Sequence, residues 1–394
     1  MCNFCAPAQA QYFTIKSGNT QDVAIELVRN LIVIKLKINN KGPFNFILDT
    51  GVGFMLITDP KLLDSFIVNK NRSIKIAGLG ETEPIEAFVT APLKVDVDGL
   101  ESHNVSAAIL KDDALGLSGY SGKPIHGLLG YEFFCQLAVK IKFSDTTMQV
   151  AKPKDMRFFR RGVKLPIKID GQKPYLDTKV VFADGTEKLS KLVIDLGAGH
   201  FLSMENLENK AVLQKNAITA NLGMTVTGFM NGTVSRIKQL DLGKYKMKDV
   251  ITSFPDFDEN LRALSAKRDG NLGIAMLKKF DIIISYPDSV LYLKPGLSIN
   301  KKDEHDMSGL VYYTNLKDDF KHIIIHKVEE GSAADVAGLQ PNDEIVSINF
   351  KPVSPLSMQQ IDNLFKSADG RSFMLGIFRD HEFLNVMLTL KRRI

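Results

Sequence analysis

The stretch FNFILDTGVGFMLIT, residues 44–58, places an aspartate between two apolar runs. Each run has the length and the β-branched or aromatic content of a buried strand. Asp49-Thr50-Gly51 is therefore expected at a strand end, where packing alone does not call for a carboxylate. A single triplet is also compatible with an ordinary turn, because Asp and Gly are common turn residues. The interpretation depends on whether the pattern recurs elsewhere in the chain.

A second copy occurs at residues 191–204, KLVIDLGAGHFLSM, with Asp195 aligned on Asp49. Each copy also has a downstream partner that we interpret as an apolar pair closed by glycine. The first, PIHGLLGYEFF, contains Gly130, and the second, GNLGIAMLKKF, contains Gly273. The spacings are 130 − 49 = 81 and 273 − 195 = 78 residues. The shared order and spacing predict two all-β lobes related by duplication, at residues 12–155 and 156–297.

The repeated Asp-x-Gly, the glycine-bearing hairpins and the apolar-apolar-Gly segments resemble the pepsin and retropepsin fold of aspartic peptidases. Bacterial retropepsin-like proteins are the most similar, over residues 32–295. The resemblance implies two β-barrel lobes that each supply one catalytic aspartate, Asp49 and Asp195. The residues implied to support this pair are Thr50, Gly51, Leu196 and Gly197. A flap over the substrate is implied at Gly78, Leu79 and Gly80, with an ordinary surface β-turn as the alternative.

Such a pair has a clear chemical use. Two carboxylates about 3 Å apart cannot both ionise, so they share one proton and can activate a water for peptide hydrolysis. This chemistry needs no cofactor, and none is expected. The seven histidines show no metal-ligand spacing such as His-Glu-x-x-His, so no metal site is predicted.

Two residues depart from the family pattern. Leu196 stands where the family usually has Thr or Ser, whose hydroxyl bridges to the opposite loop. At least half of that reciprocal hydrogen bonding is therefore expected to be missing. His200 is also unusual at its position, and either perturbs the pair or simply packs or faces solvent.

The polar segment at residues 298–308 is predicted to be a linker. Residues 309–394 then resemble a bacterial PDZ domain, an α/β module, through Gly331, Ser332, Ala334, Ala337, Gly338, Leu339 and Asp343. PDZ domains bind a peptide as an added strand beside a helix. The residues expected to line this groove are Ser308, Gly309, Leu310, Val311, Ile361, Leu364 and Phe365. The ligand would be a C-terminal or internal peptide; the alternative is a domain that packs within the chain as a scaffold.

The bulk composition restricts the partners. The net charge is only +5 and no long Lys/Arg block is present, so nucleic acid is not expected. No apolar run reaches the roughly 18 residues of a transmembrane helix, so no integral membrane segment is expected. Residues 1–11 are interpreted as a signal-peptide remnant or a disordered tail. Ala8-Gln9-Ala10 resembles a signal-peptidase site, which predicts an exported, periplasmic or secreted protein.

Together these features predict an aspartic-type endopeptidase that hydrolyses peptide bonds, with a PDZ domain that recruits or positions peptide or protein substrates. The alternative is a catalytically degenerate adaptor that binds peptides through the same two folds. Leu196 favours the adaptor. The retention of both aspartates favours the enzyme. Carboxylates at a buried edge cost stability, so two of them are not expected to persist without a catalytic use.

Overall fold

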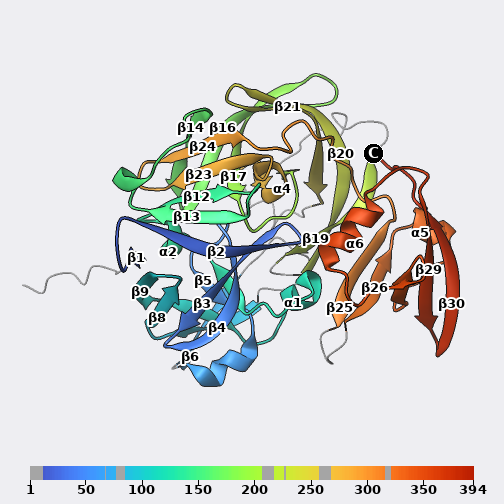
Figure 1. Cartoon of the computed structure of the whole chain (residues 1–394), viewed down its shortest axis with the longest axis horizontal. Helices are drawn as coiled ribbons and strands as arrows, with labels where there is room; N and C mark the ends of the chain where they lie inside the picture. Colours follow the sequence, from blue (N-terminus) through green and yellow to red (C-terminus); the bar gives the residue numbers. More distant parts are fainter. Residues whose placement is uncertain are drawn as a thin grey trace, which may run out of the picture.

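The computed structural model describes residues 12–66, 68–76, 85–205, 217–225, 228–256, 268–315 and 321–394. Two β-rich lobes lie together, and a smaller C-terminal domain packs beside them (Figure 1). The predicted fold class, two β lobes followed by an α/β domain, is confirmed. Within the described residues, no helix is both long and apolar enough to cross a bilayer.

The first lobe is built from short strands rich in β-branched residues. In LIVIKLKI, residues 31–38, the last side chains alternate between buried and exposed, as expected for a strand with one face on the core. The strands are β1 (Thr14–Ile15), β2 (Thr20–Val28), β3 (Leu31–Ile38), β4 (Lys41–Leu48), β5 (Met55–Ile57), β6 (Val68–Ile76), β7 (Ile85–Thr90), β8 (Leu93–Val97), β9 (Leu100–Val105), β10 (Ala107–Leu110), β11 (Gly127–Leu129), β12 (Ala138–Lys142) and β13 (Thr147–Ala151). The helices are α1 (Leu117–Ser121), α2 (Tyr131–Phe134) and the 3₁₀ helices η1 (Pro60–Ser65) and η2 (Pro153–Asp155).

The second lobe repeats the central part of this order. Its strands are β14 (Val163–Pro166), β15 (Lys168–Asp170), β16 (Lys173–Val181), β17 (Glu187–Asp195), β18 (Leu202–Met204), β19 (Ile218–Thr225), β20 (Gly228–Leu242), β21 (Tyr245–Pro255), β22 (Gly270–Gly273), β23 (Phe280–Ser285) and β24 (Val290–Pro295), with the helix α4 (Ile274–Leu277). In each lobe a strand that ends at the aspartate, β4 or β17, pairs in parallel with the glycine-bearing strand, β11 or β22.

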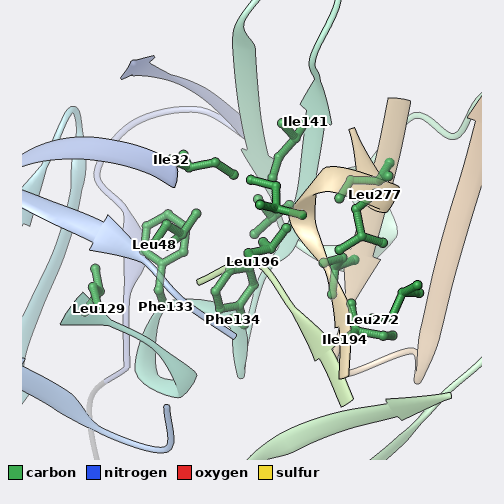
Figure 2. Packing of buried hydrophobic residues seen from close by; sticks show 14 of the residues in the cluster. Ile32, Leu48, Leu129, Phe133, Phe134, Ile141, Ile194, Leu196, Leu272 and Leu277 are labelled. Atoms are coloured by element: carbon green, nitrogen blue, oxygen red, sulfur yellow. The ribbon is translucent and has the colours of Figure 1, made fainter. Parts of the chain in front are cut away.

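The two lobes are joined by a shared sheet. The strands β2, β13 and β12 of the first lobe continue into β23, β24 and β14 of the second. The central pair, β12 and β23, is antiparallel, with Val139 opposite Ile284. The largest apolar cluster accordingly draws on both lobes, and Figure 2 shows Leu196 between Leu48 and Leu129 of the first lobe and Ile194 and Leu272 of the second. This common core holds the two aspartate loops at a set separation.

The C-terminal domain has its own apolar core beneath a six-stranded sheet. Its strands are β25 (Leu310–Asn315), β26 (His322–Val328), β27 (Glu344–Ile348), β28 (Lys351–Pro352), β29 (Ser372–Arg379) and β30 (Glu382–Thr389), and its helices are α5 (Ala333–Val336) and α6 (Met358–Phe365). The helix α6 begins at a capping box between Ser357 and Gln360, which satisfies the first free backbone N–H groups. The strand β25 lies at the edge of the sheet.

The segment predicted as a linker, residues 298–308, bonds to the second lobe and to the C-terminal domain. The buried Lys279 ammonium pairs with the Asp303 carboxylate at 3.0 Å, and the Arg236 guanidinium donates to the Asp303 carbonyl. At the other end, the Met307 N–H donates to the Phe365 carbonyl. The side chain of Ile394 completes a small apolar cluster on the second lobe. The C-terminal domain is thus attached at several points besides its covalent connection.

Candidate active site

The two aspartates lie at equivalent positions, each directly at the end of a buried strand. The Asp49 carboxylate accepts from the Gly51 N–H at 2.6 Å, and the Asp195 carboxylate accepts from the Gly197 N–H at 2.9 Å. Both side chains are buried, at 8% and 9% exposure. A tight Asp-x-Gly turn therefore holds each carboxylate in place with its own backbone.

Each carboxylate lies against the glycine of the other lobe. A Cβ atom at Gly197 would be 2.2 Å from the Asp49 Cγ, and one at Gly51 would be 2.8 Å from an Asp195 carboxylate oxygen. Only a residue without a side chain permits this approach. The duplicated motif thus brings Asp49 and Asp195 together as the sequence predicts.

The close approach changes the proton affinity of the pair. Burial raises the pKa of Asp49 well above its ordinary range, and the neighbouring charge of Asp195 and a hydrogen bond between the two carboxyl groups add to the effect. The Gly51 N–H and the Lys173 ammonium act in the opposite direction. Because like charges at this distance disfavour double ionisation, a shared proton is the expected state.

The downstream glycines allow the following helices to hold the aspartate loops. The Tyr131 N–H, at the start of α2, donates to the Val52 carbonyl, and the Ile274 N–H, at the start of α4, donates to the Ala198 carbonyl. A Cβ at Gly130 would be only 2.2 Å from that Val52 oxygen. The matched spacing seen in the sequence therefore reflects one packing arrangement made twice.

Thr50 bridges the two loops by itself. Its hydroxyl donates to the Ile194 carbonyl at 2.7 Å and accepts from the Leu196 N–H at 2.9 Å. The Leu196 side chain is fully buried among apolar residues of both lobes, including Leu48 and Phe134 (Figure 2). Leu196 therefore supports its loop by packing, and the missing hydroxyl is replaced by an apolar contact.

The change Thr50→Val is expected to lower the free energy of unfolding by about 1–3 kcal/mol, because it leaves the buried Leu196 N–H and Ile194 carbonyl without their partner. Chemical denaturation would measure the loss. Thr50→Ser keeps the hydroxyl and serves as the control, with a smaller effect. Equal stability of the valine variant and the wild type would contradict a bridging role.

Asn271 is a site residue that the sequence analysis did not single out. Its side-chain amide donates to the Asp195 Oδ2 at 3.1 Å, and the residue is buried. The equivalent position in the first lobe is the apolar Leu128. Asn271 does not fit the apolar-pair interpretation of its segment, and this mismatch between the copies is the sequence signal of a polar role.

His200 lies in the same loop, and burial lowers its pKa, while the charge of Asp195 acts in the opposite direction. Its Nε2 atom is buried without a hydrogen-bond partner in the described part of the chain. The imidazole is therefore expected to be neutral. The half-buried side chain favours packing over a position facing solvent, and perturbation of the pair by His200 stays a prediction.

Two models of known protein families match parts of the chain. Residues 34–133 match the family model described as aspartyl protease. Residues 324–379 match the family model of PDZ domains. The chain therefore combines an aspartyl protease domain with a PDZ domain. The protease match contains Asp49 and Gly130 but ends before the second lobe, which is linked to it by the internal repeat. No curated protein matches the chain.

The predicted PDZ groove residues lie on α6, on β25 and in the loop just before β25. Ile361 and Phe365 are fully buried in the PDZ core, and Leu364 packs at its edge. In the loop before β25, the Gly309 N–H donates to the Asp306 carboxylate at 2.6 Å, and the Leu310 N–H donates to the Ser308 hydroxyl. Two N–H groups of the segment expected to line the groove thus already have partners within the chain. Ser308 itself is buried, and Val311 is partly exposed.

The proposed flap residues Gly78, Leu79 and Gly80 lie outside the described residues, so the flap stays a prediction. In the described part of the chain, no three His, Cys, Asp or Glu side chains are grouped as metal ligands would be.

Proposed function

We propose that this chain is an aspartic-type endopeptidase whose catalytic pair is Asp49 and Asp195. The observation that carries the proposal is the contact of each buried carboxyl with the other lobe's Asp-x-Gly turn. That arrangement costs stability, since it brings two acidic groups out of water and next to each other. Its chemical use is to bind and polarise one water molecule.

The surroundings assign different roles to the two carboxyls at the start of the reaction. Asp49, whose pKa is raised, holds the shared proton, whereas Asp195 accepts a hydrogen bond from the Asn271 amide and serves as the base. The water oxygen bonds to the scissile carbonyl carbon while its proton passes to Asp195. Asp49 gives its proton to the carbonyl oxygen. When the C–N bond breaks, the leaving nitrogen takes the proton from Asp195 and the new carboxyl returns one to Asp49.

The variant Asn271→Leu, which copies the first lobe, tests this assignment. Loss of an N–H donor disfavours ionisation of the pair, so the doubly protonated pair is expected to lose its first proton at higher pH. The acid limb of the pH–rate profile should therefore move to higher pH. An unchanged acid limb in a folded variant would contradict the role of Asn271.

The proposal itself is tested by digesting a proteome-derived peptide library from acidic to neutral pH and identifying the products by mass spectrometry. A peptide mimic with a hydroxyl at the scissile position should compete with substrate, because it resembles the tetrahedral intermediate. Peptide binding without any cleavage would support the adaptor instead. Recruitment of substrate by the PDZ domain would require its groove to open, since Thr314 of β25 bonds to the Gly119 carbonyl of the first lobe.

A further inference from the structure

The first lobe and the PDZ domain are joined by a buried ion pair. The Arg29 guanidinium donates two hydrogen bonds to the Asp362 carboxylate in α6, both at 2.9 Å. It also donates to the Tyr120 carbonyl, and it lies over the rings of Tyr120 and Tyr312 at 4.4 and 5.0 Å. The Tyr312 hydroxyl donates to the same Asp362 carboxylate. The side chains of Arg29 and Asp362 are only 10% and 14% exposed, so water screens this contact weakly.

Asn30, the residue after Arg29, contacts the loop that follows Asp195. The Asn30 side-chain amide donates to the Gly199 carbonyl at 3.2 Å, four residues after Asp195. The Lys278 ammonium donates to the side-chain Oδ1 atom of Asn30, which ties the same side chain to the end of α4. One two-residue turn thus touches the PDZ domain on one side and the Asp195 loop on the other.

The backbone of this turn is unusual for its residues. Arg29 and Asn30 both have positive φ, 45° and 62°, as a two-residue hairpin turn requires. Asn, Asp and Gly are favoured at the first such position, and arginine there is strained. The cost is offset by the contacts of the guanidinium group. An Arg at this position therefore points to a role for its side chain.

The second lobe provides an internal comparison. Its equivalent hairpin turn, between β15 and β16, is Gly171-Gln172, also with positive φ at both residues. The Gln172 amide lies against Gly53, four residues after Asp49, just as Asn30 lies against Gly199. A Cβ at Gly171 would meet no atom within 4 Å. Each turn thus contacts the aspartate loop of the other lobe. Arginine occurs only in the first of these two turns, the one that contacts the PDZ domain.

The PDZ groove edge is the surface that the first lobe covers. Figure 1 shows α1 beside β25, the edge strand of the PDZ sheet. The Thr314 hydroxyl donates to the Gly119 carbonyl at 3.2 Å, and Arg29 lies 3.4 Å from the Tyr312 carbonyl. A Cβ at Gly122 would lie 2.8 Å from the Met358 side chain of α6. Segments of the first lobe therefore lie where a peptide ligand would approach β25 and α6.

We propose that the PDZ domain acts as a part of the catalytic apparatus, in which Asp362 is a positioning residue for the Asp195 loop. Asp362 orients Arg29, the Arg29-Asn30 turn holds Gly199, and Gly199 limits the motion of the loop that carries Asp195. This inference rests on the proposed function for its catalytic consequence. The mechanical coupling does not depend on activity.

The test compares Asp362→Asn and Arg29→Gly with the wild type. The glycine variant copies the second lobe and keeps the turn favourable, so it removes only the side chain. For a short peptide substrate, both variants are expected to lower kcat about tenfold or more while KM stays within about twofold, because the loop rather than the substrate loses its position. The double variant should be no worse than either single one, since both act through the same contact.

The control is Arg379→Gln, which breaks the Arg379–Asp343 ion pair inside the PDZ domain and leaves the first lobe untouched. It is expected to keep the wild-type kcat. A kcat loss in the control equal to that of Asp362→Asn would show that PDZ stability alone matters and would overturn the proposal. Wild-type kcat in folded Asp362→Asn and Arg29→Gly would also overturn it.

A second readout is independent of catalysis. Backbone hydrogen exchange of residues 195–201 should be about threefold or more faster in Asp362→Asn than in Arg379→Gln, because the loop has lost its outer support. If the wild type cleaves no peptide yet the exchange difference appears, the coupling stands and the proposed function fails. Equal exchange in the two variants would reject the coupling, whether or not the protein is active.

Discussion

Replacing either Asp49 or Asp195 with asparagine is expected to abolish peptide cleavage and to leave the fold intact. An amide cannot take a proton from water or share one with its neighbour, so each change removes the acid–base pair. General acid–base catalysis contributes roughly 10²–10⁴-fold, and the loss should be at least of that size. The amide keeps an oxygen that can accept from the Gly51 or Gly197 N–H, so near-wild-type thermal unfolding is expected.

The measurement is kcat/KM on a peptide found in the library digest, with Asp177→Asn as the control. Asp177 is an exposed aspartate of β16 that pairs with Lys168 and lies opposite Lys191, outside the Asp-x-Gly turn. The wild-type pH–rate profile should be bell-shaped, with both limbs belonging to the coupled carboxyls. Because the pKa of Asp49 is raised, the proton is retained above the ordinary aspartate range, and activity should extend to correspondingly higher pH. Near-wild-type turnover in either asparagine variant would reject the assignment.

The second large effect is expected for Gly197→Ala. The added methyl group would lie 2.2–2.5 Å from three atoms of the Asp49 carboxyl, so the two loops must separate. Overpacking of this kind typically costs about 1–3 kcal/mol of stability. A shift of about 1 Å in a catalytic group can lower the rate 10²-fold, so activity should fall by at least that factor.

Gly199→Ala provides the comparison for stability within the same loop. Its methyl group would approach its neighbours no closer than 3.6 Å, so the variant should unfold near the wild-type temperature. Thermal unfolding and peptide cleavage of both variants would measure the effects. Full activity in Gly197→Ala would show that the two carboxyls are not in the close contact described here.

The main features of the fold followed from local signals. The apolar runs before Asp49 and Asp195 have the content of strands, and the glycines at 130 and 273 recur at matched distances. These signals predict the architecture because strand pattern and turn glycines depend on near neighbours along the chain. The resemblance they produce is confirmed by the aspartyl protease and PDZ matches. The flap at Gly78 remains a prediction.

Other features of the site were not visible in that way. Asn271 lies in a segment whose pattern predicts an apolar pair, and only its position 3.1 Å from Asp195 Oδ2 identifies it as a hydrogen-bond donor to the catalytic pair. Leu196 suggested a weakened pair, yet in the folded chain it packs between the lobes and Thr50 makes both bridging bonds. The spacing of residues along the sequence predicts neither contact, because each contact depends on how the strands and lobes pack against each other.

The sequence by itself determined the two carboxylates, their glycine turns, the duplicated lobes and the PDZ module, because these are set by residue type and short-range pattern. Only the tertiary structure decided how the parts act on one another. Arg29 and Asp362 are 333 positions apart, and nothing in either segment marks the other as its partner. Their contact arises because burial favours pairing of a charge with whichever opposite charge the packed surfaces bring near it.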